Sequence, residues 1–270
     1  MDPASTFAGT WVTEPWLGIV VLAAAGLVAG VINTVAGGGS FLTLPLLIFY
    51  GLPAGVANGT NRIGVLLQCA AAVWSFDREQ VLERDSWQWA AVPSMLGAVG
   101  GTLFALWIDD SSFTRILAFL MVAITLLSFW SPREEKSAGE TAPEASARGS
   151  AQAERGGWLL AASFFLVGVY GGFVQAGVGF LILAATTFAG LDLVRGNAVK
   201  VLSVLCFTAL SLAMFAAQGR VSWGLGLALG VGQLAGGVLG ARLTVKKGHR
   251  WLRGVVTAAV LFFAVLLWLS

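Results

Sequence analysis

The sequence is poor in charged residues and cysteine, and each shortage excludes a class of function. Only 11% of the 270 residues are charged and 57% are hydrophobic, whereas a soluble globular domain carries roughly 25% charged residues. The net charge of +2 gives no electrostatic case for binding nucleic acid. The two cysteines, Cys69 and Cys206, lie inside apolar runs, so they are interpreted as small packing residues rather than metal ligands or a disulfide. The composition therefore predicts a chain that lies in a lipid bilayer.

Catalytic motifs and buried carboxylates are also missing. Asp192 lies at the end of a segment, and no Asp or Glu falls deep inside an apolar run, so a proton relay through buried carboxylates is not supported. The sequence has no Walker lysine motif, no His-Glu-x-x-His and no Gly-x-Ser-x-Gly. We therefore expect no enzyme, no catalytic residue and no metal site.

The sequence instead offers apolar segments, several of which approach the roughly 20 residues that a helix needs to cross a bilayer. The expected spans are 16–36, 58–74, 87–107, 113–130, 158–174, 197–217, 223–245 and 251–268. Two further apolar segments, 41–50 and 180–189, are too short for a full helical crossing.

Polar segments divide the chain into domains. Residues 1–15 contain no Lys or Arg, unlike the basic start of a signal peptide, and we expect them to be an extracytoplasmic segment. Residues 131–157 are rich in Glu, Ser, Ala and Gly and are predicted to form a flexible linker. The linker separates a first transmembrane repeat, 16–130, from a second, 158–270.

The two repeats are versions of one another. When the chain is slid so that Phe41 meets Phe180, other distinctive residues coincide without a gap. The coinciding pairs include Asn58–Asn197, Asn61–Lys200, Gly97–Gly236 and Gly101–Gly240. The Gly-xxx-Gly spacing allows close approach of two helix backbones, and it would permit a homodimer.

The distribution of Lys and Arg predicts how the two halves are oriented in the membrane. If the short segments cross the membrane, each half has five crossings and the halves are inverted; if they re-enter, each half has four and the halves are parallel. With the basic segment 242–253 in the cytoplasm, the first arrangement leaves only Arg62, Arg115 and Arg220 outside, whereas the second divides Lys and Arg almost evenly. We therefore predict an all-α polytopic membrane protein with five-plus-five inverted crossings and extracytoplasmic termini, with four-plus-four as the alternative.

Short, glycine-interrupted segments at matching positions of two halves point to a transporter's substrate site. Helices that start near Ser40 and Gly179 would direct free N–H groups and a positive dipole end at an anion. The candidate substrate-binding residues are Asn33, Thr34, Gly38, Gly39, Ser40, Asn58, Thr60, Asn61, Arg62, Gln175, Gly177, Gly179, Asn197, Lys200 and Ser203.

Other interpretations stay open at this point. The glycines can serve close helix packing alone, Arg62 and Lys200 can extend to the membrane surface as orientation signals, and Asn58 and Asn197 can be helix N-caps. A secondary transporter is the preferred function; an anion channel or facilitator, or a non-transporting membrane assembly subunit, are the alternatives.

These motifs resemble the sulfite exporter TauE/SafE family of bacterial membrane proteins. The resemblance lies in NTVAGGGSF at 33–41, LP at 44–45, ANGTN at 57–61, GGFVQAGVG at 171–179, RGNAVK at 195–200 and GGVLGAR at 236–242. It implies transport of a small sulfur-containing anion, such as sulfite, a sulfonate or a sulfoacetate-like compound, across the cytoplasmic (inner) membrane. It implies no enzyme activity and no cofactor, and it fixes neither the anion nor the direction of transport.

Overall fold

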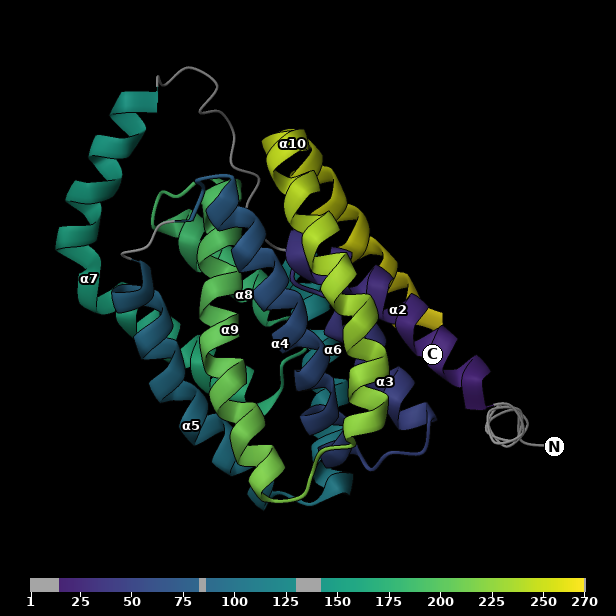
Figure 1. The fold of residues 1–270 in the computed structure, drawn as a ribbon. Helices are drawn as coiled ribbons and strands as arrows, with labels where there is room; N and C mark the ends of the chain where they lie inside the picture. Colours follow the sequence, from purple (N-terminus) through teal and green to yellow (C-terminus); the bar gives the residue numbers. More distant parts are fainter. Residues whose placement is uncertain (1–14, 83–85, 130–141, 270) are drawn as a thin grey trace.

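The protein is described here by a computed structural model that covers residues 15–82, 86–129 and 142–269 (Figure 1). Within these ranges the regular structure is helical, which confirms the expected all-helical class. The first half contains α2 (Pro15–Val35), α3 (Ser40–Phe49), α4 (Ala54–Arg78), η1 (Trp87–Ala91), α5 (Val92–Trp107) and α6 (Asp110–Phe129). The second half contains α7 (Ala142–Phe173), α8 (Val178–Phe188), α9 (Leu193–Ala217) and α10 (Trp223–Leu269).

Four helical segments in the described ranges are long and apolar enough to cross a membrane: Trp16–Val35, Gln88–Trp107, Leu193–Ala217 and Trp223–Lys247. Large apolar side chains such as Trp107 and Phe188 are more than four-fifths exposed, as expected of a surface that faces lipid. The chain is a membrane protein. The segment expected at 58–74 lies within α4, which falls outside this group because its first turns are polar.

Two expected boundaries differ from the structure. The helix α7 begins at Ala142, inside the segment 131–157 that was expected to be a flexible linker; Ala, Glu, Gln and Arg, which are frequent there, all favour helix. The helix α10 runs from Trp223 to Leu269, so the basic segment that was expected to separate two spans is itself helical. In Figure 1 α10 reverses direction at the top of the view, and its last part runs back toward the C-terminus.

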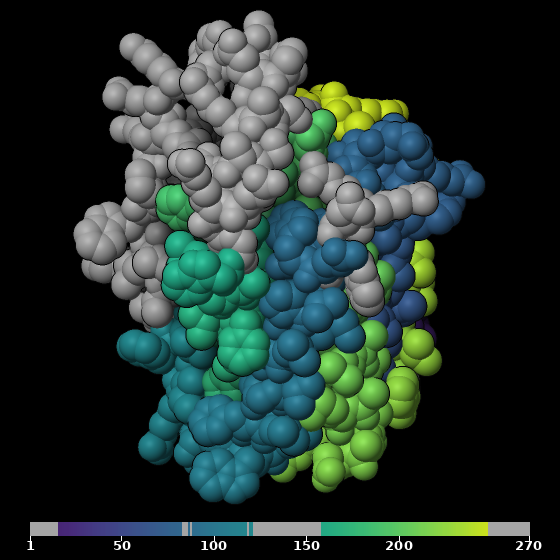
Figure 2. All heavy atoms as spheres, turned by 90° about the vertical axis from the view of Figure 1, so that its left-hand side faces the viewer, coloured from purple at the N-terminus to yellow at the C-terminus, as the bar shows by residue number. Residues whose placement is uncertain are grey.

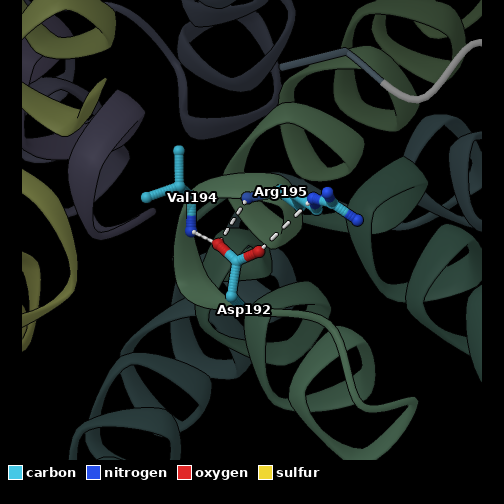
Figure 3. A network of polar contacts seen from close by, with 3 residues as sticks. All are labelled: Asp192, Val194 and Arg195. Atoms are coloured by element: carbon cyan, nitrogen blue, oxygen red, sulfur yellow. Dashed lines mark hydrogen bonds and ion pairs between the residues drawn. The ribbon is translucent and has the colours of Figure 1, made fainter. Parts of the chain in front are cut away.

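The helix starts are also earlier than expected. Asn58 and Asn197 are not N-caps, because each lies inside a helix whose N-cap is Pro53 or Asp192. Asp192 accepts hydrogen bonds from the backbone N–H groups of Val194 (2.8 Å) and Arg195 (3.1 Å), as Figure 3 shows. Its other carboxylate oxygen lies 3.5 Å from Nε of Arg195. A carboxylate at this position satisfies two backbone donors and suits the positive end of the helix, which frees Asn197 for contacts in the interior.

Glycines allow each half to pack a helix closely against the other half. A Cβ on Gly97 of α5 would lie 2.0 Å from the carbonyl oxygen of Phe165 in α7, and a Cβ on Gly236 of α10 would lie 2.4 Å from that of Leu27 in α2. Since Gly97 and Gly236 are equivalent in the repeat, the same helix crossing occurs twice, with the halves exchanged. Figure 2 shows the side of the molecule where α5 and the described part of α7 lie beside one another. The glycine spacing that could have formed a dimer face is therefore used within the chain.

Candidate functional site

The two helix breaks meet in the middle of the molecule. Gly37, in the loop between α2 and α3, has a φ of 93°, and a Cβ there would lie 2.4 Å from Cα of Gly179 in the first turn of α8. A side chain at either position would keep the two backbones apart, and the left-handed conformation of Gly37 also favours glycine. The structure thus brings together the two glycine-rich segments that the sequence analysis selected.

Lys200 joins α9 to the end of α2. Its side chain is 1% exposed, and Nζ donates to the backbone oxygens of Asn33 (3.0 Å) and Thr34 (2.7 Å) and to Oδ1 of Asn197 (2.5 Å). The last carbonyls of a helix have no partner within that helix and carry partial negative charge. The ammonium of the second half therefore caps the broken helix of the first half.

Arg62, in the first half, makes the corresponding contact with a helix end of the second half. Its guanidinium, on α4, donates to the backbone oxygens of Gly172 (2.6 Å) and Gly171 (3.3 Å) near the end of α7. Asn58 on the same helix donates from Nδ2 to the backbone oxygen of Phe173 (2.8 Å). Arg62 and Lys200 are both buried, so the interpretation of these side chains as surface-seeking orientation signals is wrong.

The other predicted polar residues lie around these contacts. Asn61 accepts from Oγ1 of Thr43 (2.6 Å) and donates to Oγ of Ser40 (3.1 Å), which ties α4 to the first turn of α3. Thr60 accepts from the backbone N–H of Ser222 (2.9 Å), ahead of α10. Ser203 is buried on α9, and its Oγ has no partner within the described part of the chain.

A small cavity lies beside Lys200, between the halves. Its lining includes Asn33, Gln68, Cys69, Gln175, Gly179 and Lys200, together with the apolar residues Val65, Val178, Val201 and Val204. These residues come from α2, α4, the break before α8, α8 itself and α9. Four of the predicted site residues line the cavity: Asn33, Gln175, Gly179 and Lys200. Arg62 does not.

Comparison with known proteins decides which family this architecture represents. The sequence profile of the family described as sulfite exporter TauE/SafE matches residues 22–267. The chain belongs to the TauE/SafE family. A probable membrane transporter protein of Haemophilus influenzae is 31% identical over 88% of this chain and 89% of its own length. The probable membrane transporter protein YfcA of Escherichia coli is 28% identical over 93% of this chain and 89% of its own length.

Membership in the TauE/SafE family agrees with the resemblance found in the sequence motifs. A probable membrane transporter protein of Xylella fastidiosa is 27% identical over 84% of this chain and 85% of its own length. No solved structure matches the chain. The chain is thus a multi-pass membrane protein with bacterial relatives, and its family is one of transporters and not of enzymes.

Besides the four valines, two residues of the cavity lining, Gln68 and Cys69, were missed in the sequence. Gln68 accepts from Nδ2 of Asn33 (2.6 Å) and donates to Oγ1 of Thr34 (2.8 Å), so it orders the end of α2 beside the cavity. Cys69, its neighbour on α4, was interpreted as a packing residue and also lines the cavity. The available signal was an amide inside an apolar helix, since a polar residue within a membrane span marks a functional position by default.

The side chain of Gln175 has a hydrogen-bonding group without a partner in the described part of the chain. Its side chain is 2% exposed, and its Nε2 donates to Oγ1 of Thr208 on α9. Among the described residues nothing donates to its Oε1. If the amide were rotated, Oε1 would accept from Thr208 and the NH₂ group would be left over instead. In either orientation, one polar group of Gln175 remains for a molecule bound in the cavity.

Proposed function

We propose that the protein moves a small sulfur-containing anion across the bacterial cytoplasmic membrane, and that the anion binds at the small cavity between the two helix breaks, which widens to admit it. One observation carries the proposal: a cavity lined by both halves contains a buried ammonium, Lys200, and amides, with no carboxylate among its lining residues. A positive charge at a site of low dielectric attracts an anion far more strongly than the same charge in water. A sulfonate or sulfite suits it because three oxygens can accept from several donors at once.

Each lining group has its own role in this proposal. The ammonium of Lys200 already uses its N–H groups on protein oxygens, so it attracts the anion by charge rather than by a direct hydrogen bond. Direct hydrogen bonds come from side-chain NH₂ groups, above all that of Gln175, which has two N–H donors and uses one of them on Thr208. They also come from the first turn of α8 around Gly179, where a helix has unpaired N–H groups. The valines of the lining limit the access of water.

The directions of the helices support the five-plus-five inverted arrangement. In Figure 1 α4 runs upward and its equivalent, α9, runs downward. Contacts agree with this, since Arg62 near the start of α4 lies 4.9 Å from the ring of Phe215 near the end of α9. The start of α2 and the end of α10 also lie on the same side of the view, as expected if both termini are extracytoplasmic. Four-plus-four crossings, with re-entrant α3 and α8, are the alternative.

Export is the direction that needs no coupling ion. At an inside-negative potential of about 100 mV, each negative charge that leaves gains about 2.3 kcal/mol. The absence of carboxylates from the cavity lining fits a carrier that does not relay protons through buried acids.

Ligand binding to the purified protein tests the proposal. Thermal unfolding is measured with sulfite, taurine, sulfoacetate, sulfate and chloride at equal ionic strength. A ligand that binds the native state raises the unfolding temperature in a saturable way, and we expect this for at least one sulfur oxyanion and not for chloride. An equal response to all the salts would contradict a selective site and favour the channel. No response of the unaltered protein to any of these anions would favour the membrane assembly subunit.

A further inference from the structure

Three oxygens surround the nitrogen of Lys200. They are the backbone oxygens of Asn33 and Thr34, at 3.0 and 2.7 Å, and Oδ1 of Asn197, at 2.5 Å. Three acceptors require three N–H donors on one nitrogen, and only the ammonium form of lysine supplies them. The three oxygens therefore match the ammonium form of Lys200, at a position almost completely shielded from solvent.

The set of ligands is that of a site for a free monovalent cation. Two of the oxygens are carbonyls where α2 ends, at the negative end of the helix dipole. In transporters with broken helices, carbonyls at such ends coordinate Na⁺ or another cation that accompanies the substrate. Here the position is filled by a side chain of the chain itself.

We propose that Asn33, Thr34 and Asn197 form a monovalent-cation site whose occupant is the ammonium of Lys200. The site as such stands on the geometry alone; its consequence for transport rests on the proposed function. A cation that is covalently attached cannot be exchanged, so the anion moves without a free cation as co-substrate. Removing the side chain should expose the three oxygens and make the protein bind a cation from solution.

Arg62 provides the contrast. It caps the equivalent helix end, but its planar guanidinium bonds to Gly171 and Gly172 and lies over the ring of Phe215. A fork of two donors against an aromatic face is specific for guanidinium geometry, so a spherical ion does not replace it. The inference therefore applies to the end of α2 and not to the end of α7.

The test uses the full-length Lys200→Ala protein in detergent, with its unfolding temperature measured in NaCl, KCl, ammonium chloride and choline chloride at equal ionic strength. We expect the variant to be less stable than the unaltered protein in choline. We expect at least one small cation to raise its unfolding temperature saturably by roughly 5 °C. The unaltered protein should unfold at the same temperature in all four salts. An equally flat response of Lys200→Ala would overturn the proposal.

Three further variants keep the test decisive. Lys200→Met fills the space with an uncharged chain and should lose stability without responding to any cation. Arg62→Ala should respond to guanidinium at low millimolar concentration and not to Na⁺. If Lys200→Ala does not fold, Lys200→Ser replaces it, since its hydroxyl adds an oxygen ligand and should strengthen the response; a flat response of this variant would equally overturn the proposal.

Flux in proteoliposomes separates this inference from the proposed function. The unaltered protein should carry sulfite equally well in sodium and in choline, and Lys200→Ala should regain flux only with the cation that stabilises it. A cation-dependent unfolding temperature without anion flux in either protein would leave the cation site standing and remove the transport function. Anion flux in the unaltered protein, together with an unfolding temperature of the variant that does not change with the cation, would remove the cation site and leave the transport function standing.

Discussion

Phe41 and Phe180, which occupy equivalent positions in the two halves, stack on one another with ring centroids 6.4 Å apart and planes 21° apart. Two equivalent residues can touch only near the axis of the operation that relates the halves. The contact therefore lies on the internal symmetry axis, where the starts of α3 and α8 meet. The breaks, the two capped helix ends and the cavity are grouped around this axis, where one small molecule can contact equivalent elements of both halves.

Removing the guanidinium of Arg62 should damage stability more than removing an exposed arginine. Arg62→Ala removes the side-chain donor to the oxygen of Gly171 and leaves the oxygen of Gly172 with the hydroxyl of Thr102 alone. The loss of a buried charged donor is expected to destabilise by about 3 kcal/mol or more. Arg62→Lys should recover only part of this, because one ammonium does not reproduce the planar fork. Thermal unfolding in detergent measures the loss. The control is Arg78→Ala, which removes an exposed side chain lying over Trp74; equal losses for Arg62 and Arg78 would contradict the role given to Arg62.

Gln175 should set the affinity for the anion. In Gln175→Leu the volume is kept while the polar group beside the cavity is lost, so we expect KM for the transported anion to rise by roughly tenfold with little change in the unfolding temperature. Initial rates over a range of anion concentrations measure KM. The matched control, Gln218→Leu, alters an exposed glutamine at the end of α9 and should leave KM unchanged. An unchanged KM in Gln175→Leu would remove this residue from the site.

Glycines in one helix should differ sharply in their tolerance of alanine. A Cβ on Gly97 would meet the carbonyl oxygen of Phe165 at 2.0 Å, whereas a Cβ on Gly100, in the same helix, would meet nothing within 4 Å. Gly97→Ala must push α5 away from α7 and should lower the unfolding temperature clearly. Gly100→Ala should be neutral or slightly stabilising, by up to about 1 kcal/mol, because alanine favours helix. Similar unfolding temperatures for the two variants would argue against the close crossing.

Labelling of single introduced cysteines distinguishes the two membrane arrangements. Glu79 follows the end of α4, and Arg195 lies in the first turn of its equivalent, α9. The five-plus-five arrangement puts both residues on the cytoplasmic side, with Ser111 on the opposite side. The four-plus-four arrangement moves Glu79 to the outside and leaves Arg195 inside. We expect a membrane-impermeant thiol reagent applied to intact cells to label Ser111→Cys and to spare Glu79→Cys and Arg195→Cys. Labelling of Glu79→Cys alone among the three would favour four-plus-four.

The helix breaks could be predicted from the sequence because their cause is local. Glycine weakens a helix wherever it occurs, and the short apolar segments next to Gly37 and Gly179 follow directly from that property. The register of the repeat also predicted which residues are equivalent. Phe41 and Phe180 are one such pair, and their contact is the one expected of equivalent residues that lie near a symmetry axis. The starts of α4 and α9 were placed too late, since Asn58 and Asn197 resemble N-caps, while Pro53 and Asp192 begin the helices a turn earlier.

The roles of the buried cations could not be predicted, because they depend on partners far away in the chain. Lys200 bonds to backbone atoms of Thr34, and Arg62 to those of Gly172. Every residue has a backbone carbonyl oxygen, so the sequence does not show which of these oxygens lack a partner. They can be identified only once the helix ends are placed in space. The same reason explains Gln68, whose function is to order the end of α2.

Anion flux into proteoliposomes that hold the purified protein tests the central claim most directly. Sulfite uptake is measured at several concentrations and at two clamped membrane potentials, with the unaltered protein and with Lys200→Ala in choline. The account predicts saturable uptake that changes with potential, because net negative charge moves, and at least a tenfold loss in Lys200→Ala. Uptake that does not saturate would replace the carrier with a channel. Equal uptake by both proteins, each shown to be folded, would contradict the claim that the anion binds beside Lys200 between the two halves.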